Sequence, residues 1–532
     1  MEDSFRLAVS NIARWGDTDV FPFAPENHIL HDKAEEVTAL LNRVHGDFDV
    51  RLKEDPPPVD VALQLITNEG FRWASQIDPL WNAYLLGLVI EAAPKLEASR
   101  IPVGSETVFS YRFAIDPERD TLFESDSWRD FTIRSEHLAR QHSYVVVADI
   151  ADFYMRVYHH RVENSLLQLK LDDPSLARRI VRLLTTFSNG PSYGLPVGGP
   201  AARALSELTL ARVDAMLTLE GIVFCRYADD YRIFAATEQE AYRNLVSLTR
   251  HLFTHEGATL QKQKTRVVKS KDFLRAPVFL AEDSTELSPE DREARKFVKL
   301  SLRFDPYSQD AAEEYERLRG ELQEFDILGM LSREVAKSRV NLPVVKRLTQ
   351  ALGFVDDDIK EAAVGTIVDN LEMLAPAMPV VLRVLDNLAS ELPPDAARAV
   401  MSELRRRILD ESYYMTLPMN LAYAFRVLRH EDRDENRILA NRIYDDPATP
   451  PFLKRDLVLH MHNWGSSAFV STQRQRYNDH HPWVQRAVLV ASFLLEDEGS
   501  HWRRRLSLSE FDRIALEWRQ EKFDEGRMEI PV

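Results

Sequence analysis

The chain has 532 residues, enough for two to four domains at roughly 150 residues each. Hydrophobic residues make up 45% and charged residues 28%, which excludes a disordered, collagen-like or disulfide-stapled chain. The net charge of −17 is not the basic balance of a strong non-specific nucleic-acid binder, so any nucleic-acid role must depend on local sites.

A single cysteine, Cys225, excludes an internal disulfide and a cysteine zinc site. Residues 1–21 contain no uncharged apolar core, so we expect no signal peptide. Every long apolar stretch is interrupted by charge, so we expect no membrane span and no membrane partner. Together these features predict a cytoplasmic protein.

The first half of the chain mixes helix and strand patterns. Apolar residues recur every three or four positions through residues 26–100, which predicts helices broken at Pro56–Pro58. The predicted elements that follow are a strand at 144–150, a helix at 156–187, a turn at 188–200, a helix at 201–219, a β-hairpin at 222–236, a helix at 238–256 and a basic strand or loop at 259–268.

The second half is almost entirely helical in pattern. A polar stretch near residue 285 predicts a domain boundary, so we expect an α+β domain over 1–285 and an all-α domain over 286–532. Prolines separate helical segments, and helix pairs recur at roughly 35–45 residues, a spacing that favours a HEAT-like helical-repeat array. An irregular helical bundle is the alternative.

Three acidic residues occupy positions where a carboxylate is costly. Asp149 ends the predicted strand YVVVAD, and Asp229 and Asp230 lie at the tip of the hairpin in YADD. Such carboxylates must be hydrated, paired or bound to metal, and neighbouring strands would bring Asp149 and Asp229 to a shared cation. Mg²⁺ prefers oxygen ligands, and two such ions can activate a 3′-hydroxyl and stabilise a pyrophosphate leaving group. For YADD alone, ordinary turn chemistry is the alternative.

Four motifs follow one another in a specific order. The chain reads DIADFYMRVYHH at 149–160, GLPVGGP at 194–200, RYADDYRIF at 226–234 and LQKQKT at 260–265. This order and spacing resemble the palm of reverse transcriptases. The resemblance implies right-hand fingers and palm over residues 1–285, dNTP substrates, and nucleotidyl transfer with Mg²⁺ or Mn²⁺.

The resemblance also implies roles for single residues. Asp149, Asp229 and Asp230 would be the catalytic carboxylates, with Asp149, Asp229 and the backbone carbonyl of Ile150 binding metal. Tyr154 would be an aromatic gate that favours dNTPs over rNTPs, unless it is a core aromatic. The residues expected to bind the nucleotide are Tyr154, Leu195, Pro196, Val197, Gly198, Lys264 and Arg112.

Two of these residues have alternatives. Lys264 would neutralise the triphosphate or protonate pyrophosphate, and a solvated basic strand is its alternative. Arg112 falls where fingers residues of related enzymes contact the incoming triphosphate, and a structural ion pair is its alternative.

Nearly the whole chain resembles the abortive-infection (AbiK-like) and defence-associated reverse transcriptases of bacteria and their prophages. The similarity is carried by VFSYRF at 108–113, VYHH at 157–160 and residues 480–504, and by the helical half that follows the palm. It implies anti-phage defence through template-independent, protein-primed DNA synthesis by a homo-oligomer, with the DNA product attached to the protein at an unknown priming residue. The alternatives are a conventional reverse transcriptase that copies an RNA partner, retron-like or intron-like, and a non-catalytic scaffold with a relic palm.

Overall fold

The computed structural model divides the chain into two compact units. The described residues are 1–67, 70–275, 293–294, 296–298, 300, 302, 311–337 and 340–532. Of these, unit 1 takes in 1–61, 74–275 and 507–521, and unit 2 takes in the others. The boundary predicted at residue 285 lies outside the described residues. Residues 507–521, which the sequence placed in the second domain, group with the first.

Helices make up most of the first 100 residues of the chain: α1 (Glu2–Trp15), α2 (Glu26–Asp32), α3 (Ala34–Gly46), α4 (Phe48–Glu54) and α5 (Pro79–Ala98). The prediction of helix through 26–100 is wrong at β1 (Val59–Leu65) and β2 (Phe71–Ile77), which pair as a two-stranded sheet. The reason is local, because prolines 56–58 end α4 and the following residues alternate in polarity as strands do.

Helix α5 is the central helix of this part, and α1 packs along it. It begins where Asp78 accepts a hydrogen bond from the Leu80 N–H group and Pro79 occupies the first turn. Most of its residues are buried. Even so, neither α5 nor any other helix in the described part of the chain has the length and apolar run that crossing a bilayer requires.

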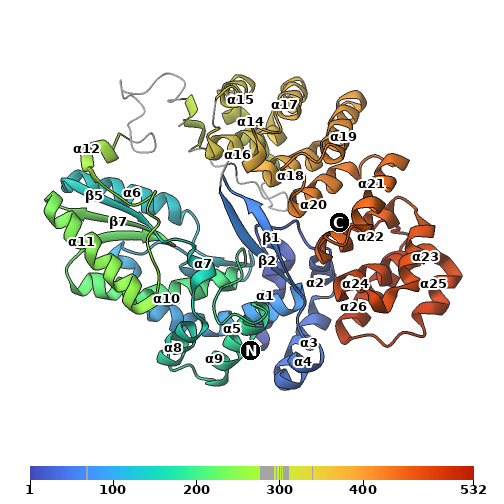
Figure 1. The fold of residues 1–532 in the computed structure, drawn as a ribbon, viewed down its shortest axis with the longest axis horizontal. Coiled ribbons are helices and arrows are strands. Elements are labelled where there is room, and N and C mark those ends of the chain that lie inside the picture. Colours follow the sequence, from blue (N-terminus) through green and yellow to red (C-terminus); the bar gives the residue numbers. More distant parts are fainter. Residues whose placement is uncertain are drawn as a thin grey trace. The chain divides into compact units, whose positions relative to one another are not determined.

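A four-stranded antiparallel sheet organises residues 144–269 (Figure 1). Its order is β6-β7-β5-β8, with β5 (Tyr144–Asp149), β6 (Val223–Tyr227), β7 (Asp230–Ala235) and β8 (Arg266–Lys269). The predicted strand at 144–150 and the predicted hairpin at 222–236 are therefore confirmed. The β-branched residues of β5 suit its central place between β7 and β8.

Helices pack on this sheet. Side chains of α6 (Ser127–Gln141) and α12 (Ser270–Phe273) form an apolar core with Val145, Cys225 and Phe234 of the strands. The hydroxyl of Thr237 caps α11 (Glu238–His251), which packs on β5 and β7. The remaining elements of unit 1 are β3 (Phe113–Asp116), β4 (Thr121–Phe123), α7 (Phe153–Arg156), α8 (His159–Gln168), α9 (Ser175–Phe187), α10 (Pro200–Leu219), the π-helix Leu252–Glu256 and most of α26 (Glu510–Asp524).

The main body of unit 2, over residues 311–337 and 340–506, consists of helices joined by turns and loops. Successive even-numbered helices pack on one another from α16 to α24. A HEAT-like repeat stays a prediction, because this alternate packing identifies no particular repeat family. The helices are α14 (Ala311–Leu322), α15 (Ile327–Val335), α16 (Leu342–Ala351), α17 (Asp357–Asp369), α18 (Met378–Leu388), α19 (Pro394–Leu409), α20 (Pro418–Leu428), α21 (Asp434–Asp445), α22 (Pro451–Asn463), α23 (Ser467–Gln475), α24 (Pro482–Ala491) and α25 (Glu496–Arg503).

Candidate active site

Three carboxylates meet at one end of the four-stranded sheet, and we call them the acidic end: Asp149, Asp229 and Asp230. Asp149, the last residue of β5, pairs in register with Asp230, the first residue of β7. The Ile150 N–H group donates to the Asp229 carbonyl at 3.1 Å, which fixes the turn against the end of β5. The structure thus brings together the three acidic residues that the sequence singled out.

The charges at the acidic end are poorly compensated. Burial, followed by the negative charges of Asp230 and Asp149, raises the pKa of Asp229 to about 7. Burial and the charge of Asp149 also raise the pKa of Asp230. No arrangement of three His, Cys, Asp or Glu side chains in the described residues forms a ready-made metal cage. The excess of negative charge on oxygen donors nevertheless suits a divalent cation such as Mg²⁺.

Lys264 is a cation in direct contact with the acidic end. Its Nζ donates to Oδ2 of Asp149 at 2.7 Å. The loop that carries it is held in place because the Gln261 N–H group donates to the Asp149 carbonyl at 2.7 Å. Although burial alone would lower it, the hydrogen bond and charge of Asp149 raise the pKa of Lys264, so its ammonium stays protonated at neutral pH. This direct contact with Asp149 distinguishes Lys264 from a lysine on a solvated basic strand.

Tyr154 lies on α7, four residues after Ile150, and its ring is half-buried. Burial raises the pKa of its hydroxyl to about 12, and the hydroxyl is 3.5 Å from the Oγ of Ser206. The neighbouring Phe153 is 5% exposed and is the core aromatic of the pair. Tyr154 therefore keeps partial access to solvent.

The loop that contains Leu195, Pro196, Val197 and Gly198 runs beside α7, since the Leu195 N–H group donates to the Tyr154 carbonyl at 2.8 Å. Leu195 and Val197 point into the protein, being 2% and 9% exposed. Gly198 has φ +118°, and a Cβ there would lie 2.1 Å from Oγ1 of Thr18. The glycine thus makes room for the N-terminal segment of the chain, a different reason from the approach of a nucleotide.

Arg112 is enclosed by other groups of the protein, which corrects the prediction that it contacts the triphosphate. Its side chain is 2% exposed and its donors are engaged inside the protein. Nε donates to the Val108 carbonyl at 2.9 Å, Nη1 to Glu97 Oε1 at 2.6 Å and Nη2 to the Ile101 carbonyl at 2.5 Å. The structural ion pair, the alternative for this residue, is what the structure shows.

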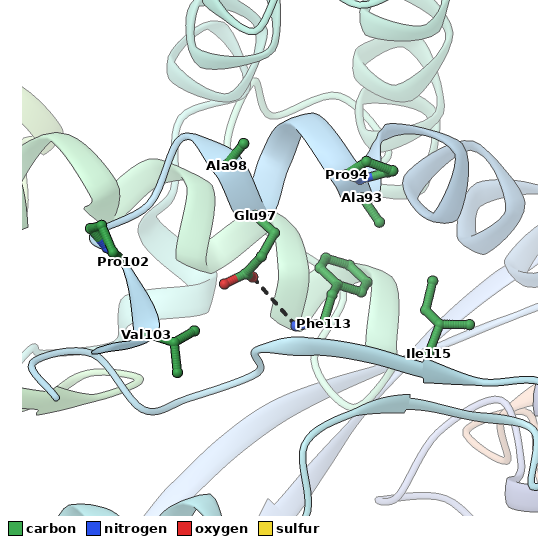
Figure 2. A pocket seen from close by; sticks show the side chains of 8 residues that line it. All are labelled: Ala93, Pro94, Glu97, Ala98, Pro102, Val103, Phe113 and Ile115. Atoms are coloured by element: carbon green, nitrogen blue, oxygen red, sulfur yellow. Dashed lines mark hydrogen bonds between the residues drawn. The ribbon is translucent and has the colours of Figure 1, made fainter. Parts of the chain in front are cut away.

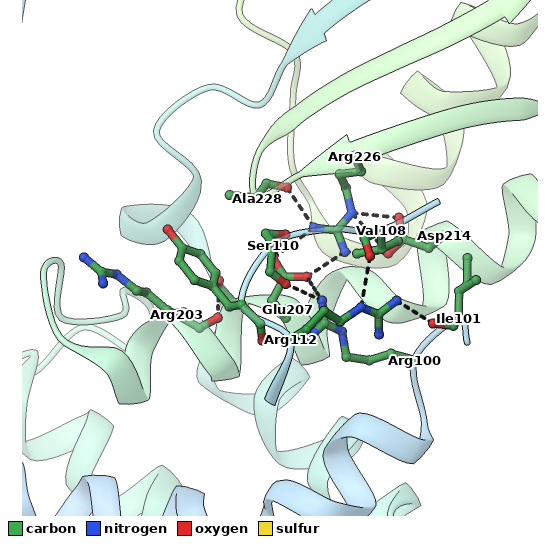
Figure 3. A network of polar contacts seen from close by, with 12 residues as sticks. Arg100, Ile101, Val108, Ser110, Arg112, Arg203, Glu207, Asp214, Arg226 and Ala228 are labelled. Carbon is green, nitrogen blue, oxygen red and sulfur yellow. Dashed lines mark hydrogen bonds and ion pairs between the residues drawn. The ribbon is translucent and has the colours of Figure 1, made fainter. Parts of the chain in front are cut away.

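Next to the turn between β6 and β7 lies a group of buried charges that the sequence analysis did not single out. We call it the arginine network, and it consists of Arg100, Glu207, Asp214 and Arg226 (Figure 3). The available signal was an arginine in the middle of an apolar strand, VFCRY, because a charged residue there needs buried partners.

A cavity of about 450 Å³ lies along the last turns of α5 and beside β3 (Figure 2). Its walls are mainly apolar, and its one carboxylate, Glu97, already accepts hydrogen bonds from Arg112 and the Phe113 N–H group. None of the predicted site residues lines it, so it takes no part in the candidate active site.

Comparisons with known proteins bear on the same region. Residues 100–329 match the family model of the reverse transcriptase (RNA-dependent DNA polymerase). A search of the curated proteins finds no match.

Two telomerases are among the solved structures that resemble the chain. For the telomerase of Candida albicans in complex with a fragment of telomeric RNA, the identity is 12%, the TM-score 0.31, and 68% of this chain and 63% of that chain are covered. For apo telomerase of Candida tropicalis, the values are 10%, 0.32, 73% and 74%. These similarities are too distant to indicate what the present chain binds. The family match shows that the chain contains a reverse transcriptase domain.

Proposed function

We propose that the protein is a DNA polymerase whose active site is the acidic end of the sheet. One observation supports this most directly: Asp149 at the end of β5, Asp230 at the start of β7 and Asp229 in the turn before it converge, and Lys264 pairs with one of them. Oxygen donors with uncompensated negative charge fit divalent cations that bind phosphates. The match of residues 100–329 to reverse transcriptases supports the same chemistry.

In this proposal each side chain has a defined task. Asp149 and Asp229, with the Ile150 carbonyl, would hold Mg²⁺ or Mn²⁺, and Asp230 adds negative charge that favours cation binding. When bound, such ions neutralise phosphate charge and favour ionisation of the attacking 3′-hydroxyl. The protonated Nζ of Lys264 lies 2.7 Å from Oδ2 of Asp149 and can exchange that partner for the negative charge of a triphosphate or pyrophosphate.

The remaining residues would select and seat the nucleotide. Tyr154 would place its ring against the sugar and reject a 2′-hydroxyl, which favours dNTPs. The backbone of residues 195–198 would line the same pocket, since the Leu195 N–H group already contacts the Tyr154 carbonyl. Arg112 has no part in it.

We further propose a role in anti-phage abortive infection, with template-independent, protein-primed synthesis by a homo-oligomer in the cytoplasm. Its support is the sequence resemblance at 108–113, 157–160 and 480–504, together with the helical unit 2. A protein hydroxyl would take the place of the primer 3′-hydroxyl in the first transfer, so the DNA would stay attached to the chain. Because synthesis would be template-independent, an RNA template would not be required.

The test uses purified protein, Mg²⁺ and labelled dNTPs without template or primer. We expect a polymer that migrates with the protein until protease is added, and no polymer from Asp229→Asn. Free products, or products only after RNA is added, would instead favour a conventional RNA-templated enzyme. Phage protection that survives Asp229→Asn would favour a non-catalytic scaffold.

A further inference from the structure

Arg226 belongs to the RYADD motif, yet the proposed function gives it no task. Its side chain is fully buried on β6. Glu207 and Asp214, both on α10, enclose its guanidinium (Figure 3). A buried guanidinium is costly unless its N–H groups all find acceptors. The complete set of its acceptors therefore shows which segments Arg226 connects.

All five N–H groups of this guanidinium have an acceptor. Nε donates to Asp214 Oδ1 at 2.9 Å, and Nη2 donates to Asp214 Oδ2 at 2.6 Å and Glu207 Oε2 at 2.9 Å. Nη1 donates to Glu207 Oε1 at 3.1 Å and to the backbone carbonyl of Ala228 at 2.8 Å. The side chain therefore ties α10 to the turn with a planar fork that the three donors of a lysine cannot reproduce.

The carbonyl that accepts from Arg226 belongs to Ala228, whose backbone conformation is unusual for alanine. Tyr227 pairs with Asp230 across the hairpin, so Ala228 and Asp229 are its two turn residues. Ala228 has φ +50°, in the left-handed region where a two-residue hairpin normally uses glycine. An alanine keeps this conformation when its surroundings enforce it, and the hydrogen bond from Arg226 is such a constraint.

The turn is held from the other side as well. The Ile150 N–H group donates to the carbonyl of Asp229 at 3.1 Å, next to Asp149. Two consecutive carbonyls of the turn, 228 and 229, are thus fixed by Arg226 and by β5. We propose that Arg226 is a positioning residue that sets where the Asp229 carboxylate stands relative to Asp149, an inference that rests on the proposed function.

Arg100 provides a matched control. It is also buried, donates to Glu207 at 2.6 Å and to the Ser110 carbonyl at 2.7 Å, and has no hydrogen bond to the turn. Arg100→Lys and Arg226→Lys both disturb the arginine network, but only the second breaks the contact with Ala228. Asp214→Asn is a milder third variant, because it loosens the orientation of Arg226 and leaves the guanidinium in place.

The experiment measures kcat and KM for dNTPs, thermal stability, and Mn²⁺ binding by electron paramagnetic resonance in the absence of nucleotide. Arg226→Lys should lower kcat about 100-fold with little change in KM, as expected for a misplaced reacting group. It should also weaken Mn²⁺ binding about tenfold, in the range seen when groups supporting metal ligands are lost. Asp214→Asn should lower kcat about tenfold, and Arg100→Lys less than about threefold.

Equal kcat and equal Mn²⁺ affinity in Arg226→Lys and Arg100→Lys would overturn the proposal. If Arg226→Lys does not fold, wild-type kcat in Asp214→Asn would overturn it, and a tenfold loss would support it. If the wild-type protein makes no polymer, the proposed function fails, and the Mn²⁺ comparison still decides the positioning role.

Discussion

Unit 1 contains two groups of carboxylates whose pKa values the fold shifts in opposite directions. In the arginine network, Arg226 and Arg100 hold the pKa of Glu207 below its usual range, although burial alone would raise it. At the acidic end, burial and two neighbouring carboxylates raise the pKa of Asp229 to about 7. Both groups lie close to the same turn, one through Arg226 and the other through Asp229.

The difference separates carboxylates that stabilise the fold from carboxylates that are available to bind a cation. A buried carboxylate with arginine partners is costly to disturb, because removing one partner leaves an uncompensated charge. Carboxylates left close together with one lysine repel one another, and a protein retains such an arrangement where it binds something positive.

The most severe test of this comparison is Asp229→Asn. We expect DNA synthesis to fall by roughly 1,000-fold or more, while thermal stability stays equal or rises because repulsion at the acidic end is relieved. Measurements of dNTP incorporation and melting temperature check both parts. Asp172→Asn, a surface change in the same unit, should alter neither. A large loss of stability in Asp229→Asn would place Asp229 with the structural carboxylates.

Glu207→Ala should give the opposite pattern. It removes the buried carboxylate that Arg100 and Arg226 share, so we expect the free energy of unfolding to drop by about 3–5 kcal/mol. Urea denaturation measures this loss. Glu238→Ala, at the exposed start of α11, should cost less than about 0.5 kcal/mol. Equal effects of the two changes would show that the arginine network contributes little stability.

Tyr154 lies beside the arginine network, since its hydroxyl approaches Ser206, a neighbour of Glu207 on α10. Tyr154→Val removes the bulk that would meet a 2′-hydroxyl, so incorporation of rNTPs relative to dNTPs should rise about tenfold. Tyr154→Phe keeps the ring and should keep the discrimination. Competition assays with mixed nucleotides measure the ratio, and an unchanged ratio in Tyr154→Val would remove the gate role.

Glu256 is a carboxylate outside both groups, and burial also perturbs its titration. Burial raises its pKa from 4.5 to about 7, and Arg161 and Arg212 offset this only in part. Between these pH values the folded chain keeps a proton that the unfolded chain has lost, so stability falls as pH rises through this window. Glu256→Gln should remove about 1–2 kcal/mol of that dependence. Urea denaturation at pH 5 and pH 8 checks this, and an unchanged slope would contradict it.

The sequence alone predicted much of the candidate site because the relevant signals are local. The β-branched run that ends in Asp149 predicts a buried strand, and the apolar runs around Asp229 and Asp230 predict a hairpin. The order of the motifs placed these strands in one palm, and the structure pairs them in register. The same local signals failed at β1 and β2, where apolar spacing in a mixed region resembled a helix.

Which charges are paired and which side chains are enclosed became visible only in the three-dimensional fold. Arg112 stands in a motif that suggested a phosphate contact, yet Glu97 and two backbone carbonyls enclose it. Gly198 makes room for Thr18, a residue far away in the chain. The carboxylate partners of Arg226 come from α10, so they are recognised only when α10 is seen beside the hairpin. Spacing along a sequence indicates strands, turns and motifs, whereas burial and charge compensation depend on contacts between distant segments.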